Sequence, residues 1–265
     1  MENLSLALFQ SDLHWHNRAA NLAMFEEKIW QLPKRVDVII LPEMFTTGFS
    51  MDAEDHAEPM NLHSTKWMKQ MASQTGSVVT GSFIVQENGK FFNRLLWVTP
   101  AGEISHYNKR HLFGMAREDR HYEKGQERVF VEYKGWKIMP QICYDLRFPV
   151  WSRNRVLDKE NGEMEYDLAF YIASWPQVRV SAWDILLKAR AVENLCYTVG
   201  VNRIGKDGNG IPHTGHSAAY DFKGDTVAFG EEKENILLVE LDKQALAAFR
   251  QKVPFWKDGD RFELN

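Results

Sequence analysis

Apolar and polar positions follow two patterns that alternate along the whole chain. Short continuous apolar runs, such as 36–41, predict strands that are buried on both faces. Longer stretches with apolar residues at helical spacing, begun by a cap such as Asn17 or ended by a glycine such as Gly76, predict helices. Strands are expected at 4–9, 36–41, 78–85, 91–98, 104–109, 136–142, 167–173, 197–201, 217–222, 226–229 and 236–241, and helices at 18–32, 64–75, after Pro149, at 181–196 and from Asp242.

This alternation indicates an α/β protein. Turns at 86–90 and 100–103 join three consecutive strands, and 205–215 is expected to be a glycine-rich loop. No linker, low-complexity tract or repeat of fixed period divides the chain. We therefore expect residues 1–265 to form a single domain, with a mixed sheet covered by helices on both sides.

Composition excludes several classes of function. The chain has 36 acidic and 32 basic residues, a net charge of −4, and no basic block, so nucleic-acid binding is not expected. Its apolar runs are too short to span a membrane, and its first residues lack a secretory signal pattern. With only two cysteines in a domain of this size, a reduced, cytoplasmic location is expected.

Three apolar segments each end in an ionisable residue. Glu43 follows the run at 36–41, Lys109 ends the segment 104–109, and Cys143 follows 136–142. Strand ends in layered α/β folds converge on a common rim, so a carboxylate, an amine and a thiol at three strand exits predict one active site.

Each of these residues also has an ordinary interpretation. A free cysteine after an apolar run is usually a small core residue, as Cys196 is expected to be. Taken alone, Glu43 fits an exposed loop and Lys109 a solvated basic cluster. The turn at 144–149 favours a reactive Cys143, because outward-pointing amides can lower a thiol pKa and bind an oxyanion.

Motifs for metals and nucleotide cofactors are missing. There is no His-Glu-x-x-His, Cys-x-x-Cys, Gly-x-Gly-x-x-Gly or phosphate-binding loop, and His14-Trp-His16 is an isolated pair on a loop. We therefore expect neither a metal nor a cofactor.

The three strand exits and their flanks resemble the catalytic blocks of the nitrilase superfamily of carbon-nitrogen hydrolases. The resemblance covers nearly the whole chain and implies a four-layer α-β-β-α sandwich with mixed sheets, which usually forms a homodimer through a helical face. The segments that carry it, in the family's order, are Leu41-Pro-Glu43, Asn108-Lys-Arg-His-Leu112, Ile142-Cys-Tyr-Asp-Leu-Arg147, Ala173-Ser-Trp-Pro176, Ala189-Arg-Ala-Val-Glu-Asn194, Val201-Asn202 and Gly215-His-Ser217.

The resemblance also implies roles for matching residues. Cys143 would be the nucleophile, Glu43 the general base, and Lys109 with the backbone amide of Tyr144 the oxyanion donors. The family typically has a further glutamate between the lysine and cysteine blocks. Glu118 matches it best, since it lies seven residues before a glycine as the family's glutamate does, and Glu123 is the alternative.

Within the superfamily the chain is most similar to the omega-amidase branch, which removes the distal amide of 2-oxoglutaramate and 2-oxosuccinamate. The alternatives are an amidase of deaminated glutathione and a carbamoyl or aliphatic amidase. A small carboxylate-bearing amide requires a cation in the pocket. Arg147 and Arg117 are the candidates, and a structural ion pair with Asp145 is the competing interpretation of Arg147.

Three further residues are candidates for the apolar wall of the pocket, or else for ordinary core: Phe113, Met115 and Trp175. The aromatic tail at about 253–265 is expected to pack across a dimer interface. A non-catalytic binding protein would have lost part of the Glu-Lys-Cys triad, and a thiol redox sensor would need a resolving cysteine closer than Cys196.

Overall fold

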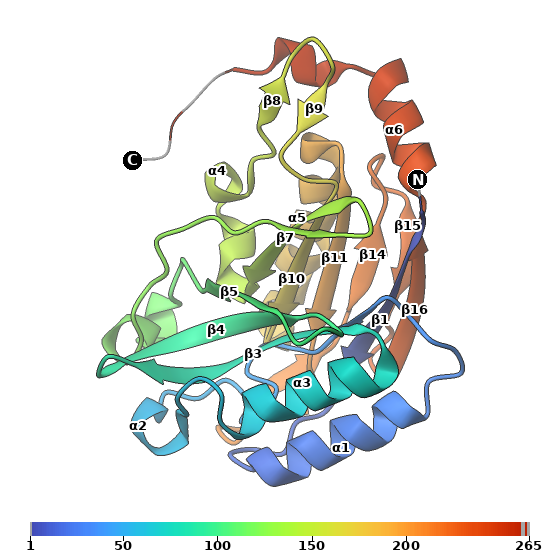
Figure 1. Cartoon of the computed structure of the whole chain (residues 1–265). Helices are drawn as coiled ribbons and strands as arrows, with labels where there is room; N and C mark the ends of the chain where they lie inside the picture. Colours follow the sequence, from blue (N-terminus) through green and yellow to red (C-terminus); the bar gives the residue numbers. More distant parts are fainter. Residues whose placement is uncertain (1, 261–262, 264–265) are drawn as a thin grey trace.

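The computed structural model describes residues 2–260 and 263, which form two large mixed sheets packed face to face (Figure 1). The first sheet has the strand order β16 (Asn235–Leu241), β1 (Leu4–Gln10), β2 (Val38–Ile40), β3 (Val78–Glu87), β4 (Lys90–Val98) and β5 (Ile104–Asn108). The second has the order β15 (Thr226–Phe229), β14 (Ala218–Tyr220), β11 (Tyr197–Asn202), β10 (Leu168–Ala173), β7 (Trp136–Ile142) and β6 (Val131–Tyr133).

The two sheets share one pattern of strand directions. In each, the central strands run parallel: β1, β2 and β3 in the first sheet, and β7, β10 and β11 in the second. Antiparallel strands extend the sheets on both sides. Because the carboxyl ends of parallel strands lie at one edge of a sheet, the residues that follow β2, β7 and β10 can meet.

Successive side chains along a strand point to opposite faces of the sheet, and so they belong to different layers of the fold. On β1, Leu4, Leu6 and Leu8 belong to the core between the sheets, whereas Ala7 and Phe9 face the helices on the outer side. Each fully buried leucine contributes about 1.5–3 kcal/mol to folding.

Helices cover the outer side of each sheet. Helices α1 (Arg18–Trp30) and α3 (His63–Thr75) pack together over the first sheet, and α5 (Val180–Asn194) covers the second with Trp183, Leu187 and Ala191 (Figure 1). The arrangement is a four-layer α-β-β-α sandwich, which confirms the expected fold class.

The predicted caps of the helices are present. The Asn17 side chain accepts a hydrogen bond from the backbone of Ala20 at the start of α1, and Gly76 adopts the left-handed conformation at the end of α3. Asp242 caps α6 (Lys243–Lys252) in the same way as Asn17 caps α1. No helix of residues 2–260 is long and apolar enough to cross a membrane.

Several local elements differ from the sequence prediction. The segment 205–215, expected as a loop, contains a small hairpin of β12 (Ile204–Lys206) and β13 (Pro212–Thr214). Its many glycines are typical of a loop, so the sequence did not predict these strands. A Cβ on Gly205 would lie 2.3 Å from the carboxylate of Asp12, so close packing requires this glycine. The helix after Pro149 is the single turn α4 (Pro149–Ser152).

Short elements outside the two sheets were not predicted. They are the helix α2 (Ala53–His56), the hairpin of β8 (Val156–Asp158) with β9 (Glu163–Met164), and 3₁₀ turns at Gly114–Ala116, Glu118–Arg120, Gln177–Arg179 and Phe255–Asp258, whereas the turn expected at 144–149 is present as the 3₁₀ turn Cys143–Arg147. Such elements are too short to carry a periodic apolar signal.

Candidate active site

The predicted strand exits converge on one buried cluster. Lys109 directly follows β5 and Cys143 directly follows β7, while Glu43 comes shortly after β2. The ammonium of Lys109 donates a hydrogen bond to Oε1 of Glu43 at 2.8 Å, although the two residues are 66 positions apart. Both side chains are fully buried.

Lys109 lies between two carboxylates. Besides Glu43, it donates to both oxygens of Glu118, at 3.0 and 2.9 Å. Burial by itself lowers the pKa of Lys109, but the negative charges of Glu118 and Glu43 outweigh it and raise the pKa above its ordinary value. The lysine is therefore held as a cation, and removing one partner from such a group costs about 3–5 kcal/mol.

Glu43 is fixed by further donors. The amide of Asn93, on β4, donates to its Oε1 at 2.9 Å, and the backbone N–H of Ser174, after β10, donates to its Oε2 at 2.8 Å. With Lys109, three donors from three different strands orient this carboxylate. Such anchoring satisfies the requirement that a buried carboxylate be paired and hydrogen-bonded.

The structure distinguishes the two candidate glutamates. Glu118 is fully buried, accepts hydrogen bonds from Lys109 and accepts one from the backbone N–H of Phe113 at 2.6 Å. Burial raises the pKa of Glu118, Lys109 counteracts that effect, and Glu43 adds to it. Glu123 instead is exposed and pairs with Lys90 at the surface. The residue in the cluster is therefore Glu118.

Cys143 has an unusual backbone conformation. Its φ is +46°, in the left-handed region that non-glycine residues seldom adopt, and it opens the 3₁₀ turn Cys143–Arg147. The first N–H groups of a helical turn have no partner within the turn, so the N–H of Tyr144 is of the kind that can bind an oxyanion. Burial, and then the charge of Glu43, raise the pKa of the Cys143 thiol, while Lys109 lowers it.

Asp145 connects the end of β5, which Lys109 follows, to the end of β7, which Cys143 follows. Its Oδ2 accepts hydrogen bonds from the hydroxyl of Tyr107 at 2.8 Å and from the N–H of Ile142 at 3.1 Å. Its Oδ1 accepts from the backbone N–H of His111 and lies 2.8 Å from that ring's Nδ1. Within residues 2–260, Asp145 forms no ion pair with Arg147, so the competing interpretation of Arg147 is wrong.

A pocket of about 430 Å³ opens above Cys143. Of the residues predicted to bind substrate, Phe113, Tyr144, Arg147 and Trp175 line it. Met115 is 75% exposed and Arg117 is exposed, and both lie outside the lining. The predictions that placed Met115 and Arg117 in the pocket are therefore not matched by the structure: Arg117 is exposed on the 3₁₀ turns at 114–120, and Met115 lies at the surface with its sulfur 3.7 Å from Nη2 of Arg179.

The pocket also contains basic side chains that the sequence did not single out. Arg179 lies 5.4 Å from the ring centre of Phe113, as Arg147 lies 4.9 Å from that of Trp175. His213, on β13, lines the same pocket, and burial with the nearby charge of Arg203 lowers its pKa to about 4. Asn93 and Ser174 were likewise missed, because only tertiary packing brings them to Glu43.

Two parts of the site have different chemistry. We call Glu43, Lys109, Glu118 and Cys143 the pocket floor; its three ionic side chains are fully buried, and Cys143 is partly buried. We call six of the side chains that line the pocket the pocket wall: Phe113, Tyr144, Arg147, Trp175, Arg179 and His213.

The chain is similar to proteins of known sequence that belong to one family. Residues 5–251 match the carbon-nitrogen hydrolase family. The chain is 42% identical to the omega-amidase YafV of Escherichia coli (strain K12), with 100% of both chains covered. It is 31% identical to the 2-oxoglutaramate amidase of Bacillus subtilis (strain 168), with 96% of each covered.

Solved structures agree with the sequence matches. XC1258 from Xanthomonas campestris, a CN-hydrolase superfamily protein with an arsenic adduct in its active site, has a TM-score of 0.97 and 42% identity over 100% of both chains. Saccharomyces cerevisiae Nit3, of the nitrilase superfamily, has the same fold, with a TM-score of 0.81 at 24% identity over 96% of this chain and 95% of its own. The chain therefore belongs to the carbon-nitrogen hydrolase family of the nitrilase superfamily, and it is a hydrolase of carbon–nitrogen bonds other than peptide bonds.

Proposed function

We propose that this protein is an omega-amidase that hydrolyses the terminal amide of a 2-oxo acid amide, 2-oxoglutaramate or 2-oxosuccinamate, through a cysteine thioester. The observation that carries the proposal is the pocket floor: Cys143 faces a pocket from beside a fully buried Glu43–Lys109–Glu118 group. The names of the relatives, omega-amidase and 2-oxoglutaramate amidase, support the choice of substrate.

In the first half-reaction, Glu43 takes the proton from the Cys143 thiol as the sulfur attacks the amide carbon. The carbonyl oxygen becomes an oxyanion, which the Lys109 ammonium and the Tyr144 N–H stabilise. One such donor is typically worth about 3 kcal/mol. When the carbon–nitrogen bond breaks, Glu43 returns the proton to the leaving ammonia and an acyl thioester remains.

In the second half-reaction, Glu43 takes a proton from a water molecule that attacks the thioester carbon. The same oxyanion donors act again, the carbon–sulfur bond breaks, and the proton passes from Glu43 to the sulfur. The products are a dicarboxylate and the restored thiol.

The electrostatics of the floor suit this sequence of steps. Since the pKa of Cys143 is raised, the resting thiol is neutral and needs a base at the moment of attack. Glu118 accepts two hydrogen bonds from Lys109, so we assign it the positioning of that ammonium.

The pocket wall supports a substrate with a carboxylate at its far end. Arg147 and Arg179 bring two guanidinium groups into a pocket whose other lining is largely aromatic and apolar. A guanidinium binds a carboxylate with two parallel hydrogen bonds, so we assign the substrate carboxylate to Arg147, with Arg179 as a second donor. Deaminated glutathione, which carries the same 2-oxoglutaramate end, is the alternative substrate.

Ammonia release on four compounds tests the proposal. They are 2-oxoglutaramate, glutamine, a neutral aliphatic amide and a simple nitrile, each offered to the native enzyme and to Cys143→Ala. We expect turnover of the 2-oxo acid amide alone, lost in the variant. Turnover of neutral amides or nitriles would instead assign the same chemistry to another branch of the superfamily.

We also infer that the protein is a cytoplasmic, single-domain homodimer that associates through a helical face. Three apolar side chains at or before α5 are exposed: Val178 at 81%, Ile185 at 67% and Val192 at 46%. Ile185 and Val192 lie on α5, whereas Val178 precedes it and also lines the active-site pocket, and exposed apolar side chains on a helix are typical of an interface. Two free cysteines fit a reducing compartment.

The C-terminal tail is assigned to the same interface. Trp256 is buried in its own protomer, where its ring lies against Gly162, but Phe255 is 66% exposed. Residues 261, 262, 264 and 265 lie outside the described residues. Ile185→Asp should shift sedimentation toward the monomer, Phe255→Asp should weaken the dimer less, and unchanged sedimentation in both would refute this interface.

A further inference from the structure

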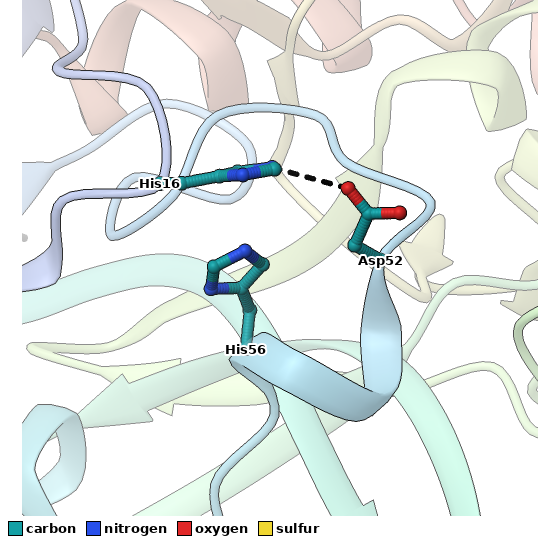
Figure 2. A group of neighbouring side chains, drawn as sticks. All are labelled: His16, Asp52 and His56. Carbon is teal, nitrogen blue, oxygen red and sulfur yellow. Dashed lines mark ion pairs between the residues drawn. The ribbon is translucent and has the colours of Figure 1, made fainter.

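Two histidines and one aspartate meet beside the active-site pocket, outside the pocket floor and wall. Figure 2 shows His16, from the loop after β1, next to Asp52 and His56, which lie at the two ends of α2. One ligand atom from each residue lies within 4.8 Å of the others. The sequence predicted no metal here, because only His14 and His16 are neighbours along the chain, and His14 is not part of this group.

We propose that His16, Asp52 and His56 form a binding site for a divalent transition-metal ion of the zinc type. Two imidazoles with one carboxylate are a ligand set that zinc binds, with an open fourth position for water. Imidazole nitrogens select zinc, cobalt, nickel or copper over magnesium and calcium, which prefer oxygen ligands.

The local backbone brings the ligands together. Asp52 and His56 are separated by one helical turn, so both side chains project from the same face of α2. His16 has a φ of +54°, and its ring stacks between Trp15, at 4.4 Å, and His56, at 3.9 Å between ring centres. Its Nε2 lies 2.7 Å from the hydroxyl of Ser50 and 3.8 Å from Oδ2 of Asp52.

The remaining gap is small. Zinc lies about 2.0–2.2 Å from nitrogen and oxygen ligands, so two ligand atoms on one ion are at most about 4 Å apart. Nε2 of His16 already lies 3.8 Å from Oδ2 of Asp52, so the remaining adjustment, less than about 1 Å, involves His56. The ring of His56 lies against that of His16, with ring centres 3.9 Å apart, and must turn for its nitrogen to face the same ion.

The surrounding charge favours a cation. Besides Asp52, the helix α2 carries Glu54 and Asp55, and the nearby cation is Arg18, whose guanidinium donates to the carbonyl oxygen of His56 and lies 3.7 Å from Glu58. Asp52, Ser50 and Trp15 also line the active-site pocket. An ion held here would place a positive charge at the pocket entrance.

Calorimetric titration with Zn²⁺ tests the site. The titrations use the full chain carrying Cys143→Ser, because a reactive thiol also binds zinc. We expect one Zn²⁺ per chain, bound at least about a hundredfold more weakly after His56→Ala, since loss of even an outer partner of a zinc ligand costs about 10–100-fold. His63→Ala removes an exposed histidine outside the group and is the matched control.

Two outcomes would overturn the proposal. One is the absence of binding tighter than about 100 µM, which corresponds to about 5–6 kcal/mol. The other is binding that is unchanged by His56→Ala and by His16→Asn, in which asparagine tolerates the left-handed backbone. If His16→Asn fails to fold, Asp52→Asn decides, because that side chain is largely exposed.

Discussion

The floor and the wall of the pocket are built on different principles. The floor places the Lys109 ammonium between the carboxylates of Glu43 and Glu118, all fully buried, and each carboxylate pairs with the ammonium. The wall places guanidinium groups against aromatic rings, on turns that follow the strands. A buried ionic group tolerates few changes because each charge needs its partner. The partly exposed side chains of the wall, Phe113, Tyr144, Arg147 and Arg179, can vary at lower cost.

The floor residues are expected to determine the reaction, and the wall residues are expected to determine which substrate is accepted. Floor residues act on the amide carbon and its oxyanion, which every amide substrate shares. Wall residues contact the rest of the substrate, which differs between branches of the superfamily. Substitutions in the floor should therefore lower kcat for all substrates, and substitutions in the wall should change KM for some of them.

The largest effect is expected at the nucleophile. Cys143→Ala should lower kcat by at least about 10⁴-fold, since loss of a nucleophile removes the covalent route. Thermal unfolding should be nearly unchanged, because the side chain is small and faces the pocket. Cys196→Ala, at a buried position directly before β11, is the matched control and should retain activity. Native-like turnover by Cys143→Ala would refute the assignment.

Lys109→Met should show that the floor has two functions. We expect kcat to fall at least about a hundredfold, because an oxyanion donor is lost. We also expect a loss of about 3–5 kcal/mol in unfolding free energy, since Glu43 and Glu118 are left buried without their cation. Urea denaturation and ammonia release measure the two effects.

A second substitution separates these two effects. Adding Glu118→Gln to Lys109→Met removes one uncompensated charge and should restore part of the stability without restoring kcat. Recovery of both together would mean that Lys109 acts through structure alone.

The wall should respond through substrate binding. Arg147→Ala should raise KM about tenfold for 2-oxoglutaramate, because a hydrogen bond to a charged group is worth about 1.5–3 kcal/mol. A neutral amide should be affected much less. Arg117→Ala is the matched control, since Arg117 is exposed outside the pocket. Equal changes for charged and neutral amides would limit Arg147 to packing over Trp175.

The sequence predicted the floor better than the wall. Glu43 and Cys143 each follow an apolar run, and such a strand exit can be recognised locally because burial on both faces leaves an apolar signal. Lys109 follows the half-exposed strand β5, so its assignment depended on the family resemblance. The four-layer fold followed from the family resemblance of these same exits, since composition and periodicity alone indicated only helices on both sides of a mixed sheet.

The remaining parts of the site depend on tertiary packing. Glu118 and Glu123 lie on one short segment, and only the 3₁₀ turn Glu118–Arg120 determines which of them faces Lys109. Arg179 and His213 carry no local signal, because their positions depend on how α5 and the β12–β13 hairpin meet the second sheet. The group at His16 unites two distant segments and was missed for the same reason.

The wall residue His213 differs from the ionic residues of the floor in the charge that it carries when buried. In the floor every charge has a partner, whereas His213 is buried near the fully buried Arg203 and stays neutral, with a pKa of about 4. An unfolded histidine has a pKa of about 6.5. Between these values the unfolded chain binds a proton that the folded chain does not, so this residue makes the fold less stable as pH falls from about 6.5 to about 4.

His213→Gln should reduce that dependence on pH. Between pH 7 and pH 5 the native protein should lose about 2 kcal/mol of unfolding free energy through this histidine, and the variant should lack that component. Urea denaturation at the two pH values measures it, and the difference between proteins cancels the other titrating groups. His63→Gln, at an exposed histidine, should keep the native dependence. An unchanged pH dependence in His213→Gln would mean that the folded protein protonates His213 as readily as the unfolded chain, and the wall would then hold a third cation for the substrate carboxylate.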